Sequence, residues 1–148
     1  MFRHLLVPTD GSELSDQAVQ RAISFAKESG GKITFFFARP NTAASMYGET
    51  ALLRSMDPAL LEKTVHQQAK EILAKAESLA KAGGVECDSV SAATNTEPYE
   101  GIINVAKDKG CDLILMASHG YRGVKGLLLG SQTQKVLTLS KLPVLVYR

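Results

Sequence analysis

Apolar runs alternate with helical periodicities along the whole chain. Apolar residues recur every four positions from Leu14 to Ala26, which predicts a helix with one apolar face. The run from Phe35 to Phe37 is apolar without alternation, as is typical of a strand covered on both faces. The same reasoning predicts strands at 2–7, 32–38, 85–93, 113–117 and 144–147, with helices at 12–29, 57–82, 97–109 and 131–140.

The predicted order is therefore β-α-β-α-β-α-β-α-β. Such alternation indicates an α/β fold, with a parallel sheet and helices on both of its faces. Residues 85–93 alternate in polarity, which favours an edge strand with one wetter face. Residues 39–56 show no period and are predicted to form a long loop. We find no internal repeat or linker, so residues 1–148 are expected to form a single domain.

Composition narrows the class of protein without naming a function. The chain has 148 residues and a formal net charge of +2, which is too small to indicate a nucleic-acid surface. Cys87 and Cys111 lie apart, without metal-ligand spacing, and are interpreted as small buried residues in a reducing compartment. Neither a secretory leader nor a long apolar span is seen. We expect a cytoplasmic protein.

The segment after the fourth predicted strand contains the candidate ligand-binding residues. It runs from Ser118 to Ser131, contains several glycines together with Arg122 and Lys125, and enters a helix. A glycine-rich loop presents backbone N–H groups to an anion, and a helix N-terminus adds about half a unit of positive charge. This pattern predicts a phosphate cradle. The alternative is that the glycines only permit tight turns and that Gly130-Ser131 is a plain helix cap.

The fold class also predicts where a ligand would bind. In an open parallel sheet the crevice lies beyond the carboxyl ends of the strands, where the strand order reverses. If the first and fourth strands are neighbours, Asp10 faces the glycine-rich segment. Phosphate would repel this carboxylate, so a sugar hydroxyl, a base or a metal ion is its better partner. The alternative is that Asp10-Gly11 only forms a turn that supports the next helix.

Two common nucleotide motifs are absent from the sequence. No G-x-G-x-x-G follows the first strand, and no G-x-x-x-x-G-K-[ST] occurs anywhere. These absences argue against a dinucleotide-binding Rossmann site and against a P-loop NTPase.

The chain resembles the universal stress protein family, in its single-domain, ATP-binding form. The resemblance covers nearly the whole chain, from Val7-Pro8-Thr9-Asp10-Gly11-Ser12 to Pro143-Val144-Leu145-Val146. Its strongest element is the pattern G-x-x-G-x9-G-[ST], which here reads Ala117-Ser118-His119-Gly120, nine residues, then Gly130-Ser131. The spacing is kept, while alanine replaces the first glycine. The resemblance implies the strand order 3-2-1-4-5 and ATP as the ligand, with Mg or Mn bridging its phosphates in ATP-binding members.

The resemblance also implies a set of binding residues. Those around adenine and ribose are Pro8, Thr9, Asp10 and Ala38; those near the phosphates and along the cleft are Met116, Ala117, Ser118, His119, Gly120, Gly123, Gly130, Ser131, Gln132 and Thr133. Met46 and Tyr47 could reach the base if their loop closes. Ala117 is tolerated if the backbone there is extended, whereas a positive φ would cost about 1 kcal/mol or more. If the family's glycine serves the close approach of the ligand, the alanine narrows the pocket by one methyl group.

Three functions follow as hypotheses. The first is a stress-response module that binds ATP or a related adenine nucleotide. The second is a slow ATPase or phosphotransferase, for which His119 is the one candidate base near the phosphates, although a structural hydrogen bond is its more ordinary role. The third is an interaction protein whose ligand is incidental. The resemblance implies a homodimer through the last strand, and Val144-Leu145-Val146-Tyr147 lacks the lysine or proline that protects many edge strands.

Overall fold

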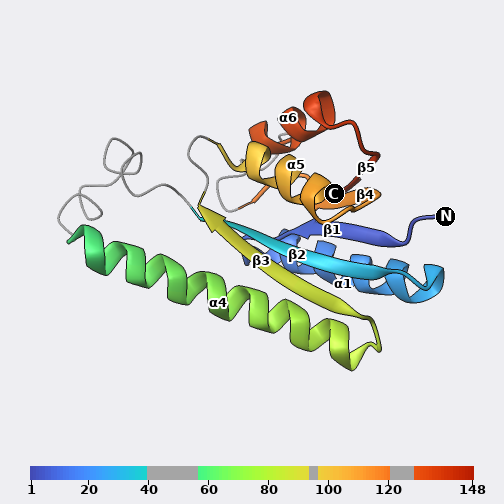
Figure 1. The fold of residues 1–148 in the computed structure, drawn as a ribbon, viewed down its shortest axis with the longest axis horizontal. Coiled ribbons are helices and arrows are strands. Elements are labelled where there is room, and N and C mark those ends of the chain that lie inside the picture. The colour runs from blue at the N-terminus through green and yellow to red at the C-terminus, as the bar shows by residue number, and fades with distance from the viewer. Residues whose placement is uncertain (40–56, 94–96, 121–128) are drawn as a thin grey trace.

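The computed structural model describes residues 1–39, 57–93, 97–120 and 129–148. Five strands and four helices alternate along these residues, as the sequence predicts (Figure 1). Their bounds are β1 (His4–Pro8), α1 (Glu13–Ser29), β2 (Lys32–Arg39), α4 (Pro58–Ala82), β3 (Cys87–Ala93), α5 (Pro98–Asp108), β4 (Leu113–Ala117), α6 (Ser131–Leu139) and β5 (Val144–Tyr147).

All five strands are parallel and form one sheet in the order β3-β2-β1-β4-β5. The expected order is thus confirmed. The chain moves outward from β1 to β3, then returns to place β4 on the other side of β1, where Leu5 pairs with Leu113. The order therefore reverses between β1 and β4, and the carboxyl ends of these two strands flank the expected ligand crevice.

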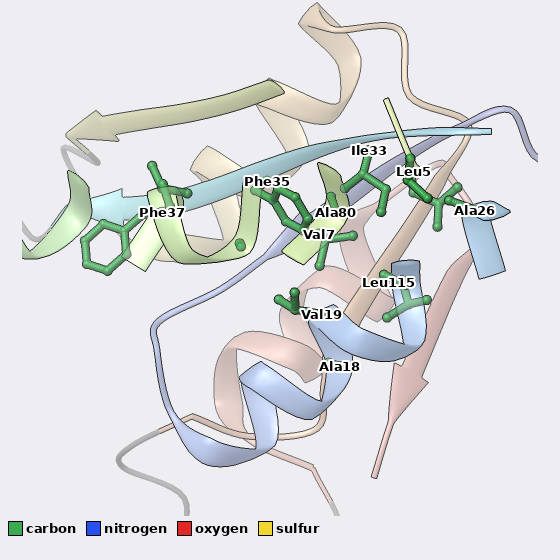
Figure 2. Packing of buried hydrophobic residues seen from close by; sticks show 14 of the residues in the cluster. Leu5, Val7, Ala18, Val19, Ala26, Ile33, Phe35, Phe37, Ala80 and Leu115 are labelled. Carbon is green, nitrogen blue, oxygen red and sulfur yellow. The ribbon is translucent and has the colours of Figure 1, made fainter. Parts of the chain in front are cut away.

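Two apolar layers enclose the sheet. On one face, Val7, Phe35 and Leu115 are buried against α1 and α4, with Val19 of α1 among their neighbours (Figure 2). On the other face, Phe36 packs in a second buried cluster, together with residues of α5 and α6. Figure 1 shows the two pairs of helices on opposite sides of the sheet. Burial on both faces explains why the central strands are continuous apolar runs.

Local signals in the sequence fix the ends of the helices. The Ser12 hydroxyl caps α1 by accepting from Ser15 N, and Gly30 ends this helix with φ of 65°. Such a left-handed conformation favours glycine. Asp57 caps α4 in the same way, with Pro58 at the first helical position. The main corrections concern strand ends, because β1 includes Pro8 and β2 continues to Arg39, which was expected in the loop.

The sheet has two edges. β3 is one of them, as its alternating polarity predicts, and β5 is the other. Leu145 of β5 keeps 39% of its surface exposed, and Leu137 and Leu139 of α6 are exposed as well. Among the described residues, no helix is long and apolar enough to cross a membrane.

Candidate functional site

The turn after β1 is held by a buried hydroxyl pair. Thr9 N donates to the Phe36 carbonyl (2.9 Å), so the chain stays beside β2 for one residue beyond the strand. Ser15 Oγ donates to Thr9 Oγ1 (2.9 Å) and accepts from Asp10 N (3.2 Å). Thr9 and Ser15 are both buried, and Pro8 is half-buried at the strand end. The first turn of α1 thereby fixes the position of Asp10.

Asp10 supports the turn before α1 and also lies against the segment after β4. Its Oδ1 accepts from Ser12 N (2.9 Å), and Gly11 adopts φ of 80°, so the carboxylate does support the turn before α1. Its other oxygen reaches the segment after β4, because a Cβ built on Gly120 would lie 2.0 Å from Asp10 Oδ2. The structure therefore brings the carboxylate onto the Gly120 backbone, across the reversal point of the sheet.

Ala117 is the last residue of β4 and pairs with Tyr147 of β5. The next amide, Ser118 N, continues this pairing by donating to the Tyr147 carbonyl (2.8 Å). The alanine thus keeps an extended strand conformation, which requires no glycine. Its side chain is buried in the layer that faces α1.

Hydrogen bonds hold the N-terminus of α6 against the end of β4. Gly130 N donates to the Ser118 carbonyl (2.7 Å), and Thr133 Oγ1 lies 3.1 Å from the same oxygen and 3.0 Å from the Ala117 carbonyl. A Cβ on Gly130 would lie 3.1 Å from the Ser118 carbonyl, so this close approach favours glycine. Gly130 is the N-cap and provides no side-chain hydrogen bond, so within the described residues the first amides of α6 lack the usual side-chain cap.

The other predicted residues have several different placements. Ser118 Oγ and His119 Nδ1 lie 3.1 Å apart, which matches a structural role for the imidazole. Ser131 is exposed at the start of α6, and Ala38 is half-buried near the end of β2. The Met116 side chain is buried in the core between the sheet and the α5–α6 layer. Gln132 Oε1 accepts from Tyr99 N (3.0 Å) and so caps the start of α5.

Some predicted residues lie outside the described part of the chain. Gly123 belongs to this group, as do the two cations of the loop, Arg122 and Lys125, and the two candidate base contacts, Met46 and Tyr47. Sequence reasoning missed Ser15, which orients both Thr9 and Asp10. Its spacing from Ser12 indicates only a helix start, and no local signal reveals that a serine one turn into α1 contacts the preceding turn.

The arrangement combines four features of a site for a phosphorylated ligand: a reversal point between parallel strands, a carboxylate on one side, a close-packed glycine on the other, and a helix N-terminus without a side-chain cap. The uncapped amides favour an anion, whereas Asp10 favours a hydroxyl, an amine or a cation. Within the described residues, no group of three or more His, Cys, Asp or Glu side chains could hold a metal ion. The fold defines an α/β protein of the Rossmann-like class, with an open parallel sheet whose strand order reverses beside β1.

Comparison with known proteins identifies the family. The model of the universal stress protein family matches residues 1–148, and the chain belongs to this family. It is 32% identical to universal stress protein YxiE of Bacillus subtilis, with all of both chains covered.

Solved structures give the same result. The chain is similar to universal stress protein MJ0577 of Methanocaldococcus jannaschii, with a TM-score of 0.81, 25% identity, and 99% of this chain and 96% of that one covered. It is also similar to a universal stress protein solved in complex with cAMP, with a TM-score of 0.72, 25% identity, and coverage of 99% and 97%.

Proposed function

We propose that this protein binds ATP, or a related adenine nucleotide, in the crevice between the ends of β1 and β4, and that it acts as a regulatory module in a stress response. The observation that carries the proposal is the hydrogen bonding of the α6 N-terminus to the residue that follows β4. The bond from Gly130 N to the Ser118 carbonyl aims an uncapped helix N-terminus at the crevice, opposite Asp10. The kept spacing from Gly120 to Gly130-Ser131 and the related protein bound to cAMP support it.

Each side of the crevice then has a defined task. The first amides of α6, with Ser131 at its start, bind phosphate, because the helix dipole and the N–H groups of the first turn favour negative charge. Asp10 binds the ribose or base, where its charge is separated from the phosphates. If Mg or Mn accompanies the nucleotide, it would offset phosphate charge, and the Asp10 carboxylate at the crevice could contribute a ligand. Ala117 remains compatible with binding, because its backbone is that of an ordinary strand.

Ligand identity can be tested directly. The protein is purified without added nucleotide, and mass spectrometry of the denatured sample is expected to detect an adenine nucleotide. Calorimetric titration with ATP, ADP, cAMP and GTP, with and without Mg, then ranks them. Gly130→Val is expected to abolish binding, since the side chain would separate α6 from the Ser118 carbonyl. Thr138→Val, further along the same helix, is the control. Absence of both a bound adenine nucleotide and an ATP signal would refute the proposal.

Turnover is tested separately from binding. We expect any ATP hydrolysis to be unaffected by His119→Ala, because Ser118 Oγ already contacts the His119 ring. Loss of a measurable turnover in this variant, with ATP affinity intact, would instead establish the slow ATPase.

We also propose that the chain forms a homodimer through β5. Pro143 and Tyr147 direct their carbonyls toward β4, so the carbonyls of Val144 and Val146 point out of the sheet edge. The exposed Leu145 side chain lies on the same strand. Sedimentation velocity at micromolar concentration is expected to show a dimer that Val146→Lys converts to a monomer. A wild-type monomer would exclude this interface.

A further inference from the structure

The opposite edge of the sheet carries a second feature that the nucleotide site does not use. A groove of about 590 Å³ runs between α4 and β3. Its floor is formed by the buried residues Ala69 and Leu73 of α4, and Ser89 and Ser91 of β3 line its other side. Figure 1 shows β3 and α4 along one margin of the molecule, away from α6 and β5.

Within the described residues, no strand pairs with the outer side of β3 along this groove. Ile33 N donates to the Glu86 carbonyl (3.0 Å), and the register pairs Ile33 with Cys87. In a parallel ladder this pattern turns the backbone groups of Asp88 and Val90 toward β2 and those of Ser89 and Ser91 outward. The outward groups are on the same residues whose side chains line the groove. An extended chain added here would therefore gain backbone hydrogen bonds and groove contacts together.

This edge also lacks the usual protection against pairing. Natural edge strands commonly carry lysine, proline or a bulge, but the sequence of β3 contains neither lysine nor proline. Its one charged residue, Asp88, accepts from Thr34 and from Lys109 Nζ (2.8 Å) and belongs to the other face of the sheet. Ser91 Oγ is buried and has no hydrogen-bond partner among the described residues.

The charges along the groove select the occupant. Lys63, His66 and Lys70 of α4 line it at successive turns, and Arg39 Nη1 lies 3.3 Å from His66 Nδ1. The acidic lining residue Glu77 lies further along α4 and already accepts from Ser89.

Two further carboxylates on α4 act outside this lining. Glu62 is 4.0 Å from His66 Nε2, and Glu71 accepts from Gln67. The part of the lining that residues 63–70 of α4 contribute is thus cationic. We propose that this groove binds an extended acidic peptide segment of a partner protein, which adds as a strand to β3 and directs carboxylates toward Lys63 and Lys70.

Other occupants fit less well. The groove lining has no aromatic side chain on which a nucleic-acid base could stack. A second copy of this chain would bring its own Lys63 and Lys70 to the interface, so that four lining lysines would face only two lining carboxylates.

The test uses an end-blocked peptide of four Glu-Thr repeats with an uncharged fluorophore, followed by anisotropy. A Lys-Thr peptide is the charge control. Two further versions carry N-methyl groups on one or the other alternate set of amides, which blocks pairing without changing charge. We expect the Glu-Thr peptide to bind, the Lys-Thr peptide not to bind, and one N-methylated version to lose binding.

Protein variants give an independent readout. Lys70→Glu should weaken the Glu-Thr peptide about fivefold, the upper range for one exposed charge pair, whereas Lys141→Glu, on an exposed loop residue, should leave it unchanged. In wild type, hydrogen exchange at the amides of Ser89 and Ser91 should slow when peptide is added, while that of Asp88 and Val90 should not change. Ser91→Pro, which removes one outward donor, should weaken binding without altering ATP affinity.

Three outcomes would overturn the proposal. One is the absence of binding by the Glu-Thr peptide. Another is binding that neither N-methylated version reduces and that leaves the Ser89 and Ser91 amides unprotected, since this would be attraction by charge alone. The third is a doubling of the molecular mass that protects the same amides without peptide, which would make the groove an interface between copies of this chain.

Discussion

Replacement of Gly120 by alanine tests whether Asp10 closes onto the segment after β4. A Cβ at this position would lie 2.0 Å from Asp10 Oδ2, which is far inside contact distance, so the carboxylate must move. Gly120 does not have a positive φ, hence the alanine backbone itself is not strained. Among the described residues, the collision with the Asp10 side chain is then the structural cost.

The magnitude follows from what the carboxylate gives up. Moving Asp10 breaks its bond with Ser12 N (2.9 Å), and a half-buried hydrogen bond to a charged group contributes about 1.5 kcal/mol. Replacing glycine by alanine where the backbone allows it returns about 0.5 kcal/mol by restricting the unfolded chain. Gly120→Ala should therefore destabilise the protein by about 1 kcal/mol.

The assay is urea unfolding of four proteins: wild type, Gly120→Ala, Asp10→Ala and the double variant. Once Asp10 has been truncated, Gly120→Ala should be neutral or stabilising by about 0.5 kcal/mol, which gives a coupling of about 1–1.5 kcal/mol. The same loss in both backgrounds would refute the proposed contact between Asp10 and Gly120.

Three further predictions concern other parts of the fold. Ser15→Ala removes the hydroxyl that orients Thr9 and Asp10, and should lower the free energy of unfolding by about 1–2 kcal/mol in urea titrations, whereas exposed Ser24→Ala should change it little. Burial lowers the pKa of His4 below its ordinary value of 6.5, so folding favours the neutral ring; stability should fall as the pH drops below 6.5, and His4→Gln should remove that part of the decline. Burial raises the pKa of the Cys111 thiol to about 11, so iodoacetamide at pH 7.5 should modify Cys111 only after unfolding. Peptide mapping separates it from Cys87, and rapid labelling of Cys111 in the folded protein would contradict this burial.

The local order of the chain was readable in the sequence because each element depends on signals within a few residues. Ser12, Asp57 and Pro58 mark helix starts by capping and fixed φ, and the apolar run at 35–37 marks a strand covered on both sides. Strand ends were less certain. Pro8 and Arg39 belong to strands because tertiary pairing with their neighbours extends them, and no local signal reports that pairing.

In the candidate site, too, some features depend on one segment of the sequence and others depend on tertiary packing. The sequence by itself determined the glycine spacing from Gly120 to Gly130 and the presence of a carboxylate after the first strand, since both are properties of one segment. Only the tertiary structure placed the Asp10 carboxylate against Gly120, used Gln132 to cap another helix, and put the Ser91 backbone on the outer side of β3 beside a groove. These relations join residues that are distant in the chain, and the packing of the sheet and its two helical layers decides them.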